Sequence, residues 1–252
     1  MPMPNPLKAA LRRGDRQVGL WLSLSSPTAT EMGARAGFDW VVVDMEHTTN
    51  SESETLTHLR AAMGGTAEPM IRVPWNDAVI IKRMLDAGAR SLIVPYVQSV
   101  EEAKRAVAAT RYPPHGIRGF AGTTRANDYG RDKTYATNAA DEIFLAVQVE
   151  SPEAAKLAGE IAAIDGIDGV FVGPNDLAAN MGFVGQPTLP QVREVIASVV
   201  APVKAAGKAP GVLDFNVANA KGWFDAGFTW VAVGGDSSLL NAGLNTLVAA
   251  FR

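Results

Sequence analysis

Eight short apolar runs recur along the chain, and segments with helical spacing separate them. Each run is rich in valine, isoleucine, leucine, phenylalanine or tryptophan, which is typical of strands that are buried on both faces of a parallel sheet. The runs are residues 18–23, 39–44, 69–73, 91–95, 143–149, 168–173, 209–213 and 229–234. Strands that alternate with helices predict parallel βαβ units, and eight such units favour an α/β fold of the closed (β/α)8 TIM-barrel type.

Helix start signals stand before several of the intervening segments. Ser51 and Ser99 are each followed three residues later by a glutamate, which predicts two capping boxes. Ser151 before Pro152 predicts an N-cap and a first helical residue. A doubly wound open sheet is the alternative, because periodicity alone does not show whether a sheet closes. No G-x-G-x-x-G turn follows the first run, which favours the barrel.

Length and composition agree with one domain. The chain has 252 residues, of which 47% are apolar and 19% charged, so it can bury a large core. Because α/β barrels commonly use about 250 residues as one unit, we predict a single domain over residues 1–252.

Charge and cysteine content restrict the partners and the compartment. The net charge is −3 and no basic run exceeds the pair Arg12 and Arg13, which disfavours a nucleic-acid-binding surface. Small molecules and other copies of the chain are the expected partners. The absence of cysteine excludes disulfides, thiolate nucleophiles and thiolate metal ligands. Neither a signal core nor a run of ~20 apolar residues is present, which predicts a cytoplasmic protein without membrane contact.

Residues 111–142 form a long polar segment between the fourth helical segment and the fifth run. Loops of this length in a compact domain are commonly functional. We therefore expect this segment to lie over the active site or to pack against a neighbouring chain.

Polar residues gather at the C-terminal ends of the runs, where (β/α)8 barrels carry their catalytic groups. They are Asp44, Glu46, His47, Arg72, Gln148, Glu150, Asp176, Asp214 and Asp236. Alternation along a strand predicts that Gln148 and Glu150 point into the barrel, as does Arg72. A buried charge without a partner costs several kcal/mol, so these groups should meet each other, an ion or a ligand. A structural salt-bridge cluster is the alternative interpretation.

Glu150 and Asp176 form the most informative pair. They end consecutive runs, and neighbouring strands lie ~4.8 Å apart, so their carboxylates can share one divalent cation such as Mg2+ or Mn2+. Two carboxylates leave open positions for water and substrate, which is typical of a catalytic site. Pro174 suits the first position of a helix, whose free N–H groups attract an anion beside the proposed metal.

Eight motifs in order resemble the HpcH/HpaI family of metal-dependent class II pyruvate aldolases. The resemblance runs from about Gly19 to the C-terminus. The motifs are "VVVDMEHTTN", "IRVPWND", "MLDAG", "LIVPYVQS", "ATRYPPHGIRG", "VQVESPEA", "DGVFVGPNDLAANMG" and "GKAPGVL". The resemblance implies a (β/α)8 barrel that reversibly splits a 4-hydroxy-2-oxoacid into pyruvate and an aldehyde through a pyruvate enolate.

The same resemblance implies roles for individual residues. Glu150 and Asp176 would hold the divalent ion, Mg2+, Mn2+ or Co2+, and Arg72 would lie at the keto oxygen. Gln148 and the backbone of the turn Gly173, Pro174, Asn175 and Asp176 would bind the pyruvate carboxylate.

Proton transfer is assigned by the resemblance to His47, with Asp86 orienting the imidazole. Histidine titrates near neutrality, which suits a group that takes and returns a proton. Asp44 would hold Arg72 or nearby waters, and Glu46 receives no role.

The aldehyde side of the pocket is where the chain departs from the family pattern. Trp21, Phe120 and Leu213 are predicted pocket walls, with ordinary core packing as the alternative. Arg125 is predicted to bind an acidic or phosphorylated aldehyde. The family frequently has alanine at the position of Asn175 and smaller residues at Phe120.

The C-terminal segment carries a helical stripe of Leu240, Leu244, Leu247 and Phe251. Such a stripe commonly packs on its own domain. The family resemblance implies instead a swapped terminal helix and a trimer-based homo-hexamer.

The residues leave three other interpretations of the function. A Schiff-base aldolase would need a lysine inside the barrel, and none of the eight runs contains one. A phosphate-binding barrel enzyme is suggested by "VGGDSS" after the last run. A barrel that binds a metabolite without turnover is the third.

Overall fold

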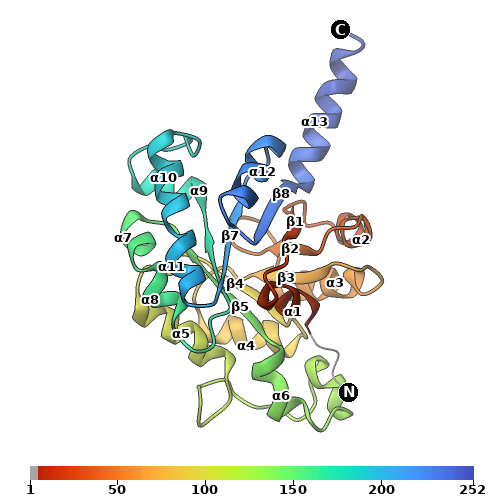
Figure 1. Ribbon diagram of the computed structural model, residues 1–252. Coiled ribbons are helices and arrows are strands. Elements are labelled where there is room, and N and C mark those ends of the chain that lie inside the picture. The colour runs from red at the N-terminus through yellow and green to blue at the C-terminus, as the bar shows by residue number, and fades with distance from the viewer. Residues whose placement is uncertain (1–4) are drawn as a thin grey trace.

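The computed structural model describes residues 5–252, and its eight parallel strands close into a barrel in sequential order (Figure 1). Strand β1 pairs with both β2 and β8, which closes the sheet. The strands are β1 Gln17–Leu22, β2 Trp40–Asp44, β3 Glu68–Arg72, β4 Ser91–Val94, β5 Phe144–Val149, β6 Gly169–Val172, β7 Ala209–Leu213 and β8 Trp230–Gly235. The predicted (β/α)8 barrel is confirmed, and the open sheet is excluded.

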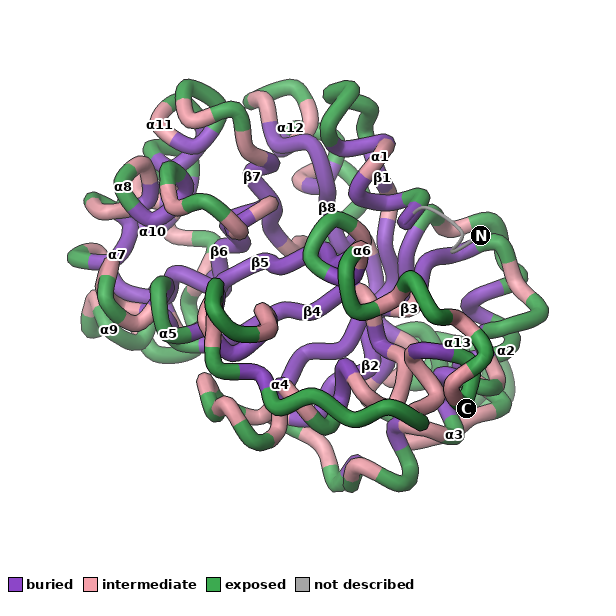
Figure 2. Tube along the Cα trace, turned by 90° about the horizontal axis from the view of Figure 1, so that it is seen from below, coloured by how far each residue is buried: buried purple, intermediate pink, exposed green. Residues whose placement is uncertain are grey.

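Helices lie in every connection from one strand to the next, while α1 precedes the first strand and α13 follows the last. They are α1 Pro6–Arg12, α2 Pro27–Arg35, α3 Glu52–Ala62, α4 Ala78–Asp86, α5 Val100–Thr110, α6 Tyr135–Glu142, α7 Pro152–Lys156, α8 Ala158–Ala162, α9 Pro174–Asn180, α10 Pro190–Ser198, α11 Val200–Ala205, α12 Val217–Asp225 and α13 Asp236–Ala249, with a short 3-10 helix η1 at Arg125–Gly130. Buried strands occupy the centre, and the exposed faces of the helices lie outside them (Figure 2).

The helix caps follow the sequence signals with one exception. Ser51 forms the predicted capping box with Glu54. Ser99 caps α5 by accepting a hydrogen bond from the backbone N–H of Glu102 at 3.2 Å. The carboxylate of Glu102 turns instead to the backbone N–H of Gln98 at 2.6 Å, so the second box does not form.

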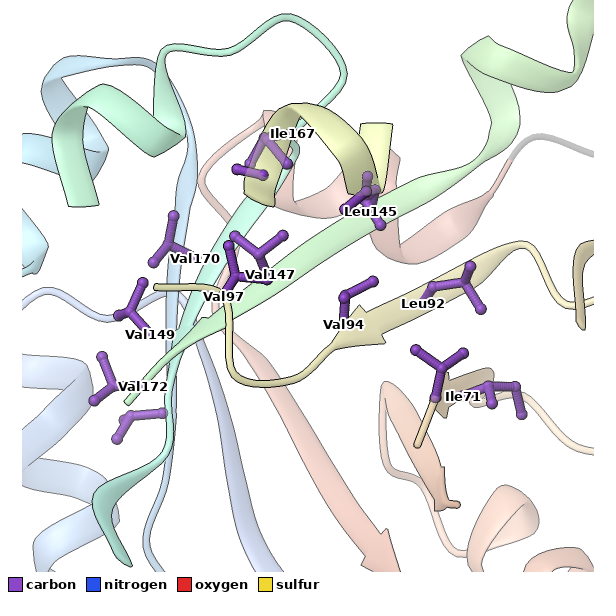
Figure 3. Packing of buried hydrophobic residues seen from close by; sticks show 14 of the residues in the cluster. Ile71, Leu92, Val94, Val97, Leu145, Val147, Val149, Ile167, Val170 and Val172 are labelled. Atoms are coloured by element: carbon purple, nitrogen blue, oxygen red, sulfur yellow. The ribbon is translucent and has the colours of Figure 1, made fainter. Parts of the chain in front are cut away.

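Alternate residues of each strand pack into two separate apolar layers. The outer layer lies between strands and helices and includes Ile71, Leu92, Val94, Leu145, Val147, Val149, Val170 and Val172 (Figure 3). The inner layer fills the barrel and includes Trp21, Trp40, Val42, Met70, Ile93, Phe144, Ala146, Phe171, Trp230 and Ala232. Gln148, Glu150 and Arg72 share the inward phase of their strands, as predicted.

Aromatic rings close the N-terminal half of the barrel interior. Trp230 contacts Trp40, Phe144 and Phe171, with ring centroids 4.8–5.5 Å apart. Leu7 of α1 belongs to the same apolar cluster. This apolar layer separates the polar side chains at the C-terminal end of the barrel from a second polar group at the N-terminal end, where buried Ser91 donates a hydrogen bond to Glu68 at 3.0 Å.

The segment 111–142 does not lie over that end of its own barrel. It contains η1 and α6, and Arg118 and Arg125 tie it to the last turn of α4 by bonds to Asp86 and Ala87. Because α4 runs back from the end of β3 toward the start of β4, its last turn lies at the N-terminal end of the barrel. In Figure 1 α6 lies at the bottom, opposite α13, and in Figure 2, seen from below, α6 lies in front of the strands.

Helix α13 projects away from the barrel (Figure 1). None of its residues is buried, and its large apolar side chains are exposed, from 50% for Val248 to 61% for Leu247. The stripe therefore does not pack on its own barrel. Within residues 5–252, no helix is both long enough and apolar enough to cross a bilayer.

Glycines in the inner layer make room for the tryptophan rings, and this packing can be tested. A Cβ at Gly19 would overlap the Trp40 indole, so Gly19→Ala should lower the free energy of unfolding by about 1–3 kcal/mol. Gly222→Ala on α12 is the control, because nothing lies within 4 Å of its added methyl group. It should leave stability unchanged or raise it by up to about 1 kcal/mol. Denaturant unfolding measures both variants, and equal effects would contradict this account of the packing.

Candidate active site

A cavity of about 350 Å3 opens at the C-terminal end of the barrel. Residues from strands β1, β2, β3, β5 and β7, from the segments that follow β1, β2, β5, β6 and β7, and from the start of α9 line it. They are Trp21, Ser23, Asp44, His47, Arg72, Gln148, Glu150, Gly173, Pro174, Asn175, Asp176, Leu213 and Phe215. Eleven of these residues were predicted from the sequence, whereas Ser23 and Phe215 were not.

Arg72 is held by a bidentate ion pair at the ends of two adjacent strands. Its Nε and Nη2 atoms donate to the two carboxylate oxygens of Asp44 at 2.9 and 2.6 Å, and its Nη1 atom lies 2.7 Å from Oε2 of Glu46. The guanidinium also stacks on the Trp21 ring, 4.8 Å from its centroid. With only 5% of the residue exposed, Arg72 has one fixed position in the cavity.

Asp44 organises the turn that follows β2. Its Oδ1 atom accepts hydrogen bonds from the backbone N–H groups of Glu46 at 3.0 Å and His47 at 3.4 Å. Burial alone would raise the pKa of Asp44, but the hydrogen bonds and the charge of Arg72 outweigh burial and hold the pKa below its ordinary value. Asp44 is therefore ionised, and its negative charge is already balanced by Arg72.

Glu150 is a buried carboxyl group, and the residues around it disfavour its negative charge. Only 1% of the residue is exposed, and its carboxylate accepts hydrogen bonds from Gln148 Nε2 and the backbone N–H of Tyr96, both at 2.9 Å. Burial, followed by the negative charges of Asp176 and Glu46, raises the pKa of Glu150 to about 8. A bound cation would remove this penalty.

The turn into α9 brings Asp176 and the backbone close to Glu150. Asp176 lies in the first turn of α9 and is half-buried. Gly173 precedes the helix, and a Cβ there would overlap the Glu150 carboxylate. Glycine is therefore needed at this position for the close approach of the turn to the carboxylate.

The residues present fit a hard divalent cation with few protein ligands. In the described part of the chain, no group of three or more His, Asp or Glu side chains is arranged to hold a metal ion. Mg2+ and similar ions commonly use one or two carboxylates and keep several waters. The two carboxylates of Glu150 and Asp176 meet that requirement. The buried Oε1 atom of Gln148, which has no hydrogen-bond partner among the described residues, adds a neutral oxygen beside them.

His47 lies at the rim of the cavity, and Asp86 lies elsewhere. The His47 side chain is 61% exposed, and its Nε2 atom is 3.9 Å from Oε2 of Glu46. Asp86 accepts a hydrogen bond from Arg118 Nη2 at 2.7 Å at the end of α4. Since that helix end lies at the opposite end of the barrel, Asp86 does not orient His47 within one chain.

Phe120 and Arg125 also lie outside the cavity of their own chain. Phe120 is 63% exposed and contacts the edge of Tyr112, with centroids 5.5 Å apart. Arg125 donates to the carbonyl oxygen of Ala87 at 2.8 Å. Both residues belong to the segment that leaves the barrel wall after α5, so strand periodicity carries no information about their position.

Two alternative interpretations lose support. No lysine from residues 5–252 lines the cavity, which disfavours a Schiff-base mechanism. At the start of α13, Asp236 accepts hydrogen bonds from the backbone N–H groups of Ser23 at 2.8 Å and Leu24 at 3.2 Å. A carboxylate therefore occupies the place that a phosphate group would need.

The chain is similar to known aldolases over nearly its full length. Residues 17–242 match the model of the family described as HpcH/HpaI aldolase/citrate lyase. A 4-hydroxy-2-oxo-heptane-1,7-dioate aldolase from Salmonella dublin is 46% identical over 250 residues, which cover 99% of this chain and 95% of the relative. The match to the family model includes all eight strands.

Solved structures agree with that match. The crystal structure of an HpcH/HpaI aldolase/citrate lyase family protein from Burkholderia cenocepacia J2315 superimposes with a TM-score of 0.94 at 39% identity, covering 98% of this chain and 100% of that one. An HpcH/HpaI aldolase from Desulfitobacterium hafniense DCB-2 gives a TM-score of 0.88 at 28% identity, covering 97% and 96%.

A buried polar chain supports the turn that carries His47. Thr30 Oγ1 lies 2.6 Å from His58 Nδ1, and His58 Nε2 lies 3.2 Å from Asn50 Oδ1. The Nδ2 atom of Asn50 donates to the backbone carbonyl of Asp44 at 2.7 Å. Because Asn50 Oδ1 is an acceptor, neutral His58 with its proton on Nε2 satisfies both contacts.

This arrangement predicts a pH-dependent stability that originates at His58. Burial lowers the pKa of His58 from its ordinary value of 6.5, so in the acid range the unfolded state binds more protons than the folded state. The free energy of unfolding should therefore fall as the pH drops below about 6.5, and His58→Gln should reduce that slope. Exposed His115, changed to glutamine, is the control and should keep the wild-type slope. Identical slopes for wild type and His58→Gln in urea unfolding at pH 5–8 would contradict the prediction.

Proposed function

The chain belongs to the HpcH/HpaI aldolase/citrate lyase family, and from this premise we propose that it reversibly cleaves 4-hydroxy-2-oxoacids to pyruvate and an aldehyde. The cavity that gathers Arg72, Gln148, Glu150 and Asp176 at the C-terminal end of the barrel is the observation that carries the proposal. In this reaction the C3–C4 bond breaks, its electron pair forms the pyruvate enolate, and the C4 hydroxyl loses its proton as the aldehyde forms. The site must therefore stabilise negative charge at the C2 oxygen and move protons.

Positive charge at the C2 oxygen has two proposed sources. Glu150 and Asp176 would hold a divalent cation, which would supply Lewis acidity for the enolate. Arg72 provides a second, fixed positive group, because Asp44, Glu46 and the Trp21 ring hold its guanidinium in place. Mg2+, Mn2+ and Co2+ are the proposed ions, and activity with each one identifies the effective metal.

The carboxylate of the oxoacid is placed by the turn between β6 and α9. We assign it to the backbone around Gly173, Pro174, Asn175 and Asp176, next to Gln148. This assignment puts the C2 oxygen toward Glu150 and Arg72. Trp21 and Leu213 then border the aldehyde portion of the substrate.

Proton transfer is assigned to His47. It is the histidine at the cavity, and its exposed imidazole can take the proton of the C4 hydroxyl and exchange it with solvent. Asp86, Phe120 and Arg125 lie at the other end of the same barrel, so any role for them in catalysis requires the cavity of a neighbouring copy.

The projecting helix α13 supports an oligomer. Its exposed stripe of Leu240, Leu244, Leu247 and Phe251 is unlike the surface of a monomer. We propose that α13 packs on another copy of the chain in a trimer-based homo-hexamer.

Assembly through α13 is testable with matched charges. Leu244→Asp buries a charge in the proposed contact and should reduce the molar mass measured by light scattering after size exclusion. Asn245→Asp is the control, because it introduces the same negative charge at the next position of the helix, outside the apolar stripe. It should retain the wild-type mass. Unchanged assembly in Leu244→Asp would remove the proposed contact.

The enolate chemistry is tested by hydrogen exchange of pyruvate in D2O. With a divalent ion the protein should deuterate the pyruvate methyl group, a chelator should abolish the exchange, and added metal should restore it. Glu150→Gln should abolish metal-dependent exchange, and Arg72→Lys should slow it about 10²-fold, the typical effect of removing one oxyanion donor. Arg105→Lys on the outside of α5 is the control and should exchange at the wild-type rate.

Two results would overturn the mechanism. Exchange that is insensitive to the chelator would exclude the metal, and pyruvate binding without any exchange would indicate a metabolite-binding barrel without turnover. Thermal unfolding of each variant confirms that it is folded.

A further inference from the structure

A second cavity borders the active-site cavity on the side of β7. It has a volume of about 210 Å3. Pro174, Asn175, Leu213 and Phe215 line both cavities and so form the wall between them. Asn175 and Phe215 are exposed, so the wall between the two cavities reaches the surface of the protein.

Arg193 supplies the positive charge in this second cavity. Its guanidinium stacks over the indole of Trp223, 4.3 Å from the ring centroid. Its Nη1 atom is 3.7 Å from Oδ2 of Asp214, which is too long for a hydrogen bond. Stacking fixes one face of the guanidinium and leaves the N–H groups at its edge free to donate.

The neighbouring Asp214 is already satisfied by other donors. Its Oδ2 atom accepts a hydrogen bond from Trp223 Nε1 at 3.0 Å, and its Oδ1 atom accepts from the backbone N–H of Asn216 at 3.1 Å. The hydrogen-bond donors in the cavity that remain available to a ligand are therefore the N–H groups of Arg193. The matching ligand group is an acceptor with the planar geometry of a carboxylate.

We propose that this cavity binds a distal carboxylate on the aldehyde portion of the substrate, and that Arg193 is its partner. The inference rests on the proposed aldolase function. The relative from Salmonella dublin is named for a heptane-1,7-dioate, whose cleavage at C3–C4 leaves the second carboxylate on a four-carbon aldehyde, 4-oxobutanoate.

The first cavity offers that second carboxylate a poor site. Arg72 is already bound by Asp44 and Glu46, and the proposed cation and the turn before α9 are taken by the pyruvate portion of the substrate. Arg125, the residue expected for this task from the sequence, lies at the other end of the barrel. Arg193 is separated from the first cavity only by the shared wall.

Aldol addition of pyruvate to two four-carbon aldehydes tests the proposal. 4-Oxobutanoate carries the distal carboxylate and butanal does not, so the ratio of their kcat/KM values isolates the contribution of the charge. Arg193→Gln should lower this ratio about 10-fold, as expected for the loss of a charge-assisted contact. Arg193→Lys should restore part of it, because lysine keeps the charge without the planar fork. Arg105→Gln, an exposed cation on α5, should leave the ratio unchanged.

The outcomes separate the two proposals. An unchanged ratio in Arg193→Gln, or an equal loss with both aldehydes, would overturn the carboxylate subsite while leaving the aldolase function intact. Failure of the wild-type protein to use either aldehyde would overturn the aldolase function and the subsite with it.

Discussion

The ion pair between Asp44 and Arg72 is the interaction on which the rest of the site depends. The two residues face each other in register at the ends of β2 and β3, and each lies at the point where its strand leaves the barrel wall. Breaking a buried ion pair by removing one partner commonly costs about 3–5 kcal/mol, because the remaining charge is left unpaired. Here the pair also positions the turn of His47 and the ring of Trp21. Catalytic geometry and local stability therefore rest on the same contact.

Charge is distributed unevenly across the cavity. On the β2 and β3 side, Arg72 neutralises Asp44 and contacts Glu46. On the β5 and β6 side, the negative charge of Asp176 adds to the cost of ionising buried Glu150, and no lysine or arginine from residues 5–252 pairs with Glu150. A substrate that brings its own carboxylate into such a site needs compensation, and the divalent ion proposed at Glu150 and Asp176 would supply it. The arrangement explains how an acidic cavity can bind an anionic substrate.

Strand periodicity accounts for most of what could be predicted from the sequence. Each run of apolar residues is a strand, and because side chains alternate along a strand, the inward direction of Gln148, Glu150 and Arg72 followed from their neighbours. The polar residues at the strand ends therefore predicted where the cavity lies. Ser23 and Phe215 lie just beyond strand ends, where alternation no longer applies.

The predicted site residues that lie away from the cavity of their own chain are found where the chain leaves the barrel wall. Asp86 ends a helix that runs back to the opposite end of the barrel, and family resemblance alone does not say in which copy a residue acts. Phe120 and Arg125 lie in a segment whose docking on α4 depends on individual bonds such as that of Arg125 to Ala87. Neither composition nor spacing encodes such contacts.

Gly173 has a consequence for how the substrate range of this barrel can change. Since the turn at Gly173 touches the Glu150 carboxylate, a side chain added at this position would displace that carboxylate. Variation is left to the rim after the neighbouring strand β7, where Leu213 ends the strand and Phe215 follows it with an exposed side chain. Diversification of acceptors, in nature or in the laboratory, is thus directed to one loop while the reacting end of the substrate keeps a constant environment.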